Sequence, residues 1–336
     1  MSVSPKKIFV IGAGFSVAAG FPLVKQLRQS VLGYLQSHHG QFFFSANEQA
    51  QFLEGLHTAD IALNAPGRNV DECFEELLIQ LRRTKGMASE SSAWTTDRLL
   101  RCATGRLLWE LSGGHLPETY WNFTSHARRA AGIVSFNWET LIESALWRSQ
   151  IPWGYSKNSP LPVIKPHGSI NWSSHNLHGT SADEMWQPIF SGSGISWIPP
   201  RSSEDQGDDN DPAFQDPFPT CVNSDLSYLL FPGDPDEPSS MHGMTDPAAN
   251  DRRAIWDQAY QLILRASSVV FLGYSLPAYD GFAQRFFRDA CKGKRVEVVN
   301  PSPEDAEGFR GKLGADIEVE LKLQKFEDSK YAQKAG

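Results

Sequence analysis

The stretch of residues 6–22 constrains the fold of this chain more than any other. It begins with consecutive apolar residues at 8–11, of the β-branched and aromatic types that favour a strand buried on both faces, as in a parallel sheet. Glycines at 12 and 14 permit a tight turn and a close approach to a ligand, and the residues from Ser16 onward have a helix-like apolar pattern. A strand, a glycine turn and a helix N-terminus together make an anion site suited to a pyrophosphate. A tight turn that binds nothing is the alternative interpretation.

Further short apolar runs follow along the chain, and helical patterns separate them. The runs span residues 132–136, 162–169, 267–276, 295–301 and 317–321. Apolar residues at helical spacing lie between them, at 23–35, 140–149 and 253–266, and phenylalanines at 282, 286 and 287 mark a further helix. This alternation predicts an α/β fold, with a Rossmann-like parallel sheet and helices on both faces.

Two regions between these elements differ from the rest. Residues from about 38 to 130 show few strand signals, and we predict a helical subdomain there, inserted into a single domain that spans 1–330. Residues 202–251 contain no Lys or Arg and many Asp, Pro, Gly and Ser, which predicts a solvated acidic loop; a lid or partner-binding loop is the alternative. Within the predicted helical subdomain, two sets of apolar residues at helical spacing indicate two helices. One set is Phe74, Leu77, Leu78 and Leu81, with Asp71 as N-cap, and the other is Leu99, Leu100, Leu107, Leu108 and Leu111.

Composition narrows the classes of function. The 336 residues are 40% hydrophobic and 21% charged, as in ordinary soluble globular proteins, and a net charge of −8 argues against direct nucleic acid binding. The four cysteines form no C-x-x-C pair, so we expect neither a zinc ribbon nor a disulfide framework. We see no signal peptide and no run of about 20 apolar residues, and therefore expect a cytoplasmic protein without a membrane span.

Small or polar residues follow each of the first five predicted strands. Because the carboxyl ends of parallel strands lie along one edge of a sheet, where ligands bind, these residues predict a nucleotide site. Taken alone, an Asn at a strand end is usually a turn former, and a His is usually structural. In strand order the residues are Gly12, Ala13, Gly14, Phe15 and Ser16; Asn137, Trp138 and Glu139; His167, Gly168 and Ser169; Gly273, Tyr274 and Ser275; and Asn300 and Pro301.

Two common nucleotide motifs are absent. The dehydrogenase fingerprint G-x-G-x-x-G fails because Val17 occupies the third glycine position, and no second strand with a terminal acid follows about 20 residues later. The Gly-Lys-Ser/Thr of phosphate-binding NTPase loops does not occur either. A dehydrogenase-type site and an NTPase-type site are therefore disfavoured.

The strand-end residues together resemble the motifs of the sirtuin superfamily, in the same order over residues 6–303. The G-A-G-x-S-x-x-x-G-x-P motif is matched at Gly12, Ala13, Gly14, Ser16, Gly20 and Pro22. Asn137 and Glu139 resemble the Q-N-I-D segment, with Glu in place of Asp, and His167 resembles the histidine of L-H-G-S. The residues from Gly273 to Leu276 resemble G-T-S-L, and Asn300 resembles the I-N motif.

The departures from the sirtuin pattern are informative too. Deacylases of the superfamily carry a four-cysteine zinc ribbon and continue the first motif with Asp-Phe-Arg, whereas here Pro22 is followed by Leu-Val-Lys. The chain is more similar to a bacterial sirtuin-like branch associated with NAD hydrolysis in antiphage defence. This resemblance implies a Rossmann-like fold with a helical subdomain, NAD as substrate and no metal. It also implies a homo-oligomer and an activating partner protein encoded nearby.

The resemblance also suggests roles for individual residues. The amides of residues 12–16 would hold the pyrophosphate, while Asn137 would orient the nicotinamide ribose or the attacking water and His167 would act as general base. Gly273, Ser275 and Asn300 would hold the adenosine side. N-capping of a helix explains Asp280 as well as a catalytic role does. The predicted activity is cleavage of NAD to nicotinamide and ADP-ribose. The alternatives are a non-catalytic NAD or ADP-ribose-binding module and a protein deacylase.

Overall fold

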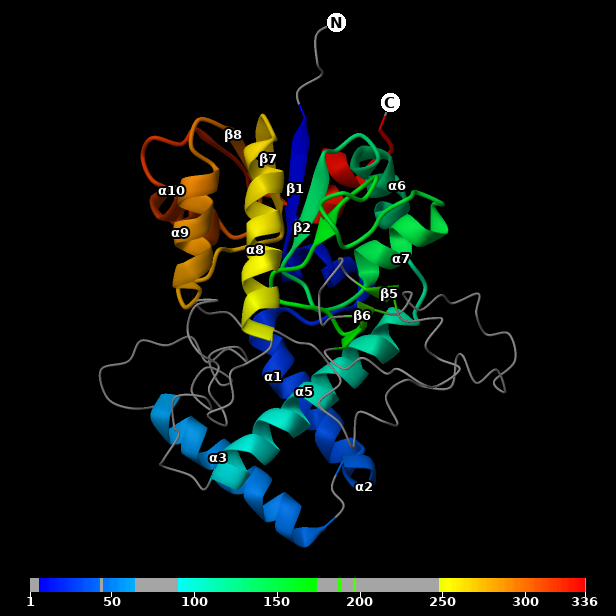
Figure 1. Ribbon diagram of the computed structural model, residues 1–336, viewed down its shortest axis with the longest axis vertical. Coiled ribbons are helices and arrows are strands. Elements are labelled where there is room, and N and C mark those ends of the chain that lie inside the picture. Colours follow the sequence, from blue (N-terminus) through cyan, green and yellow to red (C-terminus); the bar gives the residue numbers. More distant parts are fainter. Residues whose placement is uncertain are drawn as a thin grey trace, which may run out of the picture.

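The centre of the molecule is a parallel six-stranded sheet with the strand order β3-β2-β1-β7-β8-β9 (Figure 1). The structure is a computed structural model and describes residues 6–42, 45–63, 90–173, 187–188, 196–197 and 248–335. Each strand overlaps one of the predicted apolar runs, and the predicted α/β parallel sheet is confirmed. The strands are β1 (Lys7–Ile11), β2 (Gly132–Ser135), β3 (Val163–Ile164), β7 (Ser268–Leu272), β8 (Arg295–Val299) and β9 (Val319–Lys322).

The direction of strand addition reverses between β1 and β7. From β1 the chain adds β2 and β3 on one side, and it adds β7, β8 and β9 on the other. Strand β1 is therefore central, which explains why its residues from Ile8 to Ile11 are at most 1% exposed. In open α/β sheets such a reversal brings the loops after two adjacent strands to the ligand crevice. Here these are the glycine loop after β1 and the loop after β7.

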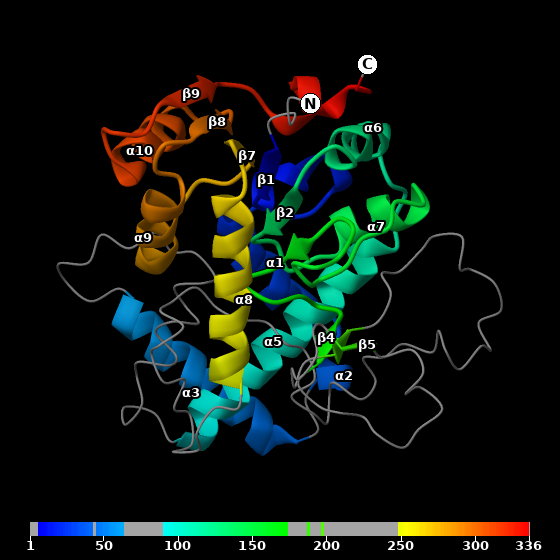
Figure 2. The ribbon, with the colours of Figure 1, turned by 45° about the horizontal axis from the view of Figure 1, so that its top comes forward.

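Helices cover both faces of the sheet, as the sequence predicts (Figures 1 and 2). Phe9 of β1 packs on Phe123, with ring centroids 5.0 Å apart. Phe271 of β7 is paired with Val10, the residue after Phe9, and it packs on Phe287 and Phe309. Successive residues of a strand point to opposite faces, so these contacts define two helical layers. The layers are α6 (Glu118–Ala127) with α7 (Leu141–Arg148), and α8 (Ala248–Leu264) with α9 (Gly281–Ala290) and α10 (Pro303–Leu313).

A group of helices extends away from the carboxyl edge of the sheet (Figures 1 and 2). It contains α1 (Val24–Ser37), α2 (His39–Phe42), α3 (Ala46–Leu63) and α5 (Glu90–Ser112), with α3 and α1 both packed on α5. Helix α6 also falls within the predicted subdomain range of 38–130, but its Phe123 packs against β1 of the sheet. The predicted helical face at Phe74, Leu77, Leu78 and Leu81 lies outside the described residues, as does the acidic segment up to residue 247.

The segment after the glycine turn differs from the prediction. Instead of a helix beginning at Ser16, the chain forms two short 3-10 turns, Ala13–Phe15 and Val17–Ala19, and α1 begins only at Val24. Gly20 ends the second turn with φ +86°, a left-handed conformation that suits glycine. Pro22 then prevents the helical hydrogen bonds from continuing. The loop therefore lacks the α-helix N-terminus expected next to a pyrophosphate.

The remaining described elements are small. A second sheet pairs β4 (Trp172–Ser173), β6 (Ser196–Trp197) and β5 (Gln187–Pro188) in antiparallel fashion. Two 3-10 turns after β9, Phe326–Asp328 and Lys330–Ala332, bring the C-terminal part of the chain back to α6. Within the described parts of the chain, no helix has the length and apolar character needed to cross a membrane.

Candidate functional site

The glycine loop after β1 packs directly against the backbone of the loop after β7. The Gly14 amide donates to the Gly273 carbonyl at 2.8 Å, and a Cβ on Gly14 would lie 2.9 Å from the Gly273 Cα. Gly273 has φ +61°, and a Cβ there would lie 2.2 Å from the Phe15 nitrogen; a Cβ on Gly12 would lie 2.7 Å from the Tyr274 ring. Glycine is thus required at all three positions by the contact between the loops, whether or not a ligand binds.

The amides of the glycine loop already have partners within the protein. Those of Gly12, Gly14, Phe15 and Ser16 each donate to a backbone carbonyl, and Ala13 is the loop residue whose amide forms no such bond within the described ranges. The acceptors are Leu272 O (3.1 Å), Gly273 O (2.8 Å), Gly12 O (2.9 Å) and Ala13 O (3.1 Å), respectively. Binding of a pyrophosphate by these amides stays a prediction, and it requires the loop to exchange these bonds for others.

The Phe15 side chain packs into the core of the protein. It is fully buried and contacts the rings of Tyr120, Phe123 and Phe326. The Tyr120 hydroxyl also donates to the Phe15 carbonyl at 2.7 Å. This aromatic cluster fixes the loop to α6, so only the backbone of Phe15 can take the predicted ligand-binding role.

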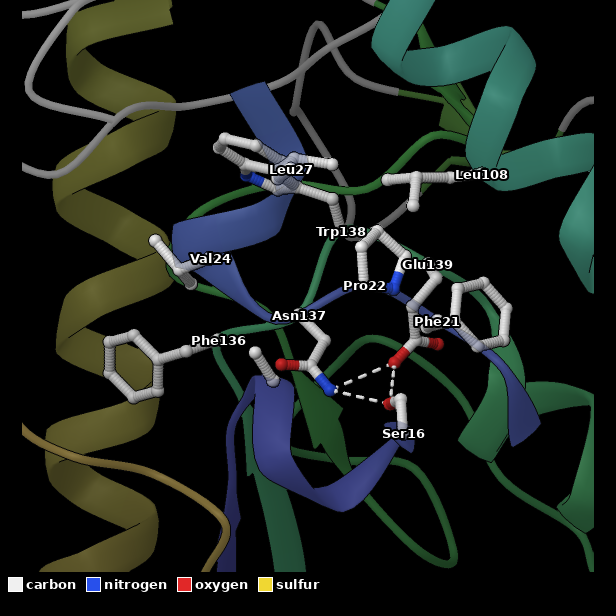
Figure 3. Close-up of a pocket in the computed structure, with 11 residues that line it drawn as sticks. Ser16, Phe21, Pro22, Val24, Leu27, Leu108, Phe136, Asn137, Trp138 and Glu139 are labelled. Atoms are coloured by element: carbon white, nitrogen blue, oxygen red, sulfur yellow. Dashed lines mark hydrogen bonds between the residues drawn. The ribbon is translucent and has the colours of Figure 1, made fainter. Parts of the chain in front are cut away.

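Three side chains from the ends of β1 and β2 form a hydrogen-bonded cluster, which we call the Asn137 cluster (Figure 3). Asn137 Nδ2 lies 2.9 Å from Ser16 Oγ and 2.8 Å from Glu139 Oε1, and it also lies 3.1 Å from the Gly12 carbonyl. The Ser16 hydroxyl donates to the same Glu139 oxygen, and the Leu141 amide donates to the other at 2.5 Å. The structure therefore brings together Ser16 and Asn137, two of the predicted site residues, although they are 121 positions apart.

The cluster determines which atom Asn137 offers to a ligand. Its amide nitrogen faces the acceptors of Ser16, Glu139 and Gly12, so the amide orientation follows from the network. The oxygen Oδ1 points away from Ser16 and Glu139 (Figure 3), and the described residues form no hydrogen bond to it. Asn137 therefore presents a hydrogen-bond acceptor, which suits a hydroxyl group or a water molecule.

A buried ion pair lies directly behind the cluster. Lys165 Nζ is 2.9 Å from Glu143 Oε1, and both side chains are fully buried. The same ammonium donates to the Glu139 carbonyl at 2.6 Å and to Ser169 Oγ at 2.9 Å. Burial raises the pKa of the Glu139 carboxyl; Lys165 opposes this effect and Glu143 adds to it. The Lys165 ammonium thus contacts the carboxylate of Glu143 and the backbone carbonyl of Glu139.

The Asn137 cluster forms the polar part of a mostly apolar pocket (Figure 3). Its volume is about 50 Å³, whereas sites for drug-sized ligands have volumes of about 300–1,000 Å³. In this conformation the pocket has room for water but not for a dinucleotide. The lining residues are Ala13, Ser16, Phe21, Pro22, Val24, Leu27, Leu108, Phe136, Asn137, Trp138 and Glu139.

His167 lies at the neighbouring strand end but does not line this pocket. Its backbone carbonyl accepts a hydrogen bond from Trp138 Nε1 at 2.8 Å, which holds the β3 loop against the β2 loop. Its imidazole packs edge-on against Phe136, with ring centroids 4.8 Å apart. Phe136 also lines the pocket, so this residue contacts the His167 imidazole and borders the pocket of the Asn137 cluster.

Asp280 is the partner of the His167 ring. Its Oδ2 lies 3.3 Å from His167 Nε2, while its Oδ1 accepts from the Ala283 amide at 2.9 Å and so caps α9. The capping role proposed from the sequence is confirmed, whereas the contact with His167 could not be predicted from sequence patterns. The two residues are 113 positions apart, since 280 − 167 = 113, and the strands that precede them, β3 and β7, are not neighbours in the sheet.

Ser275 and Asn300 lie at the same edge of the sheet but outside the pocket. Asn300 is 6% exposed, and its Oδ1 accepts from the Ser302 amide at 2.9 Å, so its side chain forms a local turn. Ser275 follows Gly273 in the loop after β7 and is partly exposed. Adenosine binding by these residues stays a prediction. Among the described residues, no group of three or more His, Cys, Asp or Glu side chains is arranged to hold a metal ion.

Comparison with known proteins gives a distant likeness. No protein-family model matches the chain, and no curated protein matches it. Among solved structures, a Sir2 in complex with an inhibitor, 2'-O-acetyl-ADP-ribose and a deacetylated p53 peptide has 13% identity and a TM-score of 0.37, over 96% of this chain and 90% of that chain. A mutant Sir2 homologue in complex with ADP-ribose has 13% identity and a TM-score of 0.39, over 97% and 89%. At these values the likeness supports no conclusion about a site or an activity.

Proposed function

We propose that this protein is an NAD glycohydrolase, which cleaves NAD to nicotinamide and ADP-ribose. The observation that carries the proposal is the Asn137 cluster. It joins the glycine loop after β1 to the Asn–Trp–Glu segment after β2 in one hydrogen-bonded unit. These are the two stretches whose sequences resemble the NAD-binding motifs of sirtuins, and they meet beside the point where the strand order reverses.

The chemistry of the scissile bond fits the groups in the cluster. The bond joins a ribose to a positively charged nicotinamide, which leaves as a neutral molecule, so no general acid is required. The site must instead stabilise the positive charge that develops on the ribose and place a water molecule at one face. The Oδ1 of Asn137, which accepts no hydrogen bond from the described residues, is an acceptor for that water or for a ribose hydroxyl.

His167 is the general base in this proposal. An imidazole in water titrates near neutral pH, which suits a group that takes a proton from a ribose hydroxyl or from water. Because His167 does not line the pocket, the reactive conformation requires the residues around it, Phe136 among them, to rearrange. The same movement enlarges a pocket of about 50 Å³ that cannot hold the substrate as it stands.

The proposed biological role rests on the sequence resemblance alone. The bacterial sirtuin-like branch that the chain resembles implies an effector of antiviral defence that depletes NAD in the cytoplasm. It also implies a homo-oligomer activated by a partner protein encoded nearby.

A second candidate function is a regulatory module that binds NAD or ADP-ribose without turnover. The observation that favours it is the position of His167, outside the pocket and paired with Asp280. Protein deacylation is a third candidate, and it needs a peptide cleft that the zinc ribbon of the deacylases helps to build. Calorimetric binding of NAD without nicotinamide release would support the module, and release of acetyl groups from a peptide would support the deacylase.

The test is incubation of the purified protein with NAD, with and without the products of neighbouring genes, followed by identification of the products by mass. We expect nicotinamide and ADP-ribose in equal amounts. The Asn137→Ala variant should lose the activity, and Asn158→Ala, at an exposed asparagine, is the matched control that should keep it. Equal activity in Asn137→Ala and the wild type would contradict the site assignment.

A further inference from the structure

Two buried polar atoms outside the pocket face each other without a hydrogen bond. His167 Nε2 and Asp280 Oδ2 are 3.3 Å apart, and neither atom forms a hydrogen bond of good geometry. The Asp280 side chain is fully buried and that of His167 is 6% exposed. Polar groups buried to this extent are almost always hydrogen-bonded in native proteins. Within the described residues each atom has the other as a close polar neighbour, so a small rotation is expected to join them.

The surroundings hold both side chains in these positions. The Phe136 ring lies edge-on to the His167 imidazole, and the Trp256 ring lies 6.1 Å from it between centroids. The other carboxylate oxygen of Asp280 accepts from the Ala283 amide in the cap of α9. This cap orients the carboxylate so that Oδ2 is directed to His167. The second imidazole nitrogen, Nδ1, forms no hydrogen bond with any residue that the structure describes.

We propose that Asp280 is a positioning residue for His167: its carboxylate accepts the Nε2 proton, fixes this tautomer and leaves Nδ1 as the basic nitrogen. A neutral imidazole carries one proton, and an ionised carboxylate can only accept, so their contact places the proton on Nε2. The role of this arrangement in NAD cleavage rests on the proposed function. The tautomer itself does not depend on it, because the fold alone sets the contact.

The proposal makes Asp280→Asn more informative than removal of the side chain. Asparagine is as good an N-cap as aspartate, so α9 keeps its cap. Its amide group can donate to Nε2, which favours the tautomer with the proton on Nδ1 and removes the base from the reactive side. Where an Asp-to-Asn change beside a catalytic histidine reverses the tautomer in this way, kcat falls by about 10⁴-fold.

We therefore expect Asp280→Asn to lower kcat for NAD cleavage by on the order of 10²- to 10⁴-fold with little change in KM. Asp280→Ser also keeps a capping side chain but is too short to reach the ring, so it should lower kcat as well. The control is Ser45→Ala, which removes the side-chain hydrogen bond to the Glu48 amide at the start of α3 and should leave kcat unchanged. Wild-type kcat in Asp280→Asn would overturn the proposal.

A readout independent of activity separates this proposal from the proposed function. Nitrogen NMR of the isotope-labelled protein, at alkaline pH where imidazoles are neutral, shows which ring nitrogen carries the proton. The His167 signals are identified by their loss in His167→Gln. We expect the proton on Nε2 in the wild type and on Nδ1 in Asp280→Asn. A wild-type proton on Nδ1 would overturn the positioning role even if the variants fail to fold. A wild-type proton on Nε2 without any NAD cleavage would instead contradict the proposed function alone.

Discussion

The Asn137 cluster and the His167–Asp280 pair lie at neighbouring strand ends but are organised differently. In the cluster, Asn137 Nδ2 and both carboxylate oxygens of Glu139 are hydrogen-bonded, and a buried ion pair supports the network from behind. In the pair, the two facing atoms are buried and not yet bonded. The difference shows that one half of the proposed site is already assembled, whereas the other half requires a rearrangement. Each prediction below tests this contrast.

The largest effect is expected from the ion pair that supports the cluster. Lys165→Met leaves the fully buried Glu143 carboxylate without its partner, and breaking a buried pair in this way typically destabilises a protein by about 3–5 kcal/mol. We expect a loss of this size in the free energy of unfolding, measured by urea denaturation. The double variant Lys165→Met/Glu143→Gln removes both charges and should recover much of the loss. A Lys165→Met variant as stable as the wild type would show that the pair does not support the cluster.

The second prediction compares the two halves of the site by kinetics. Asn137→Ala and His167→Ala should each lower kcat/KM for NAD by on the order of a hundredfold or more, equivalent to about 2.7 kcal/mol. Because Asn137 lines the pocket and His167 does not, Asn137→Ala should also raise KM, whereas His167→Ala should act on kcat alone. Steady-state rates of nicotinamide release give both constants. An unchanged KM in Asn137→Ala would argue that the ligand binds elsewhere.

The smallest expected effect concerns the pH dependence of stability. Burial raises the pKa of Glu139 above its ordinary value of 4.5, so the folded state holds the proton more tightly than the unfolded state does. The tighter binding of this proton stabilises the folded state. The stabilisation is fully present below pH 4.5 and is lost as pH rises through the folded-state pKa of Glu139. Glu139→Gln removes the titrating group, so its stability should fall less with rising pH than that of the wild type. Denaturation at several pH values checks this, with the exposed Glu318→Gln as control. Parallel pH profiles for the wild type and Glu139→Gln would contradict it.

The sequence was sufficient to predict the strands but not the contacts between them. Short apolar runs such as residues 8–11 and 269–272 become buried parallel strands because such runs fit a sheet covered on both faces. Their order in the sheet depends on which loops can pack together. That depends in turn on the close contact between Gly14 and Gly273, which no periodicity reveals. The expected helix at Ser16 was wrong because Gly20 and Pro22 end the helical conformation within one turn.

For the candidate site too, sequence patterns predicted the position of the residues but not the contacts between them. Strand-end position was enough to select Ser16, Asn137 and His167, since polar residues at the carboxyl edge of a parallel sheet come close together. The bond from Ser16 to Glu139 and the contact of Asp280 with His167 depend on side-chain geometry across more than 100 positions of sequence. The bonds of the Gly12 and Gly14 amides were hidden for the same reason, because their acceptors, the carbonyls of Leu272 and Gly273, belong to a distant segment.

The central claim is that water attacks the nicotinamide ribose in the pocket of the Asn137 cluster. The most direct measurement is NAD cleavage, with its activator if one is needed, in water enriched in heavy oxygen, followed by the mass of the product. The account predicts ADP-ribose that carries one heavy oxygen in the wild type, above an enzyme-free ADP-ribose control, and on the order of a hundredfold less of it with Asn137→Ala. A cyclic product without heavy oxygen, or labelled ADP-ribose formed equally well by Asn137→Ala, would contradict it.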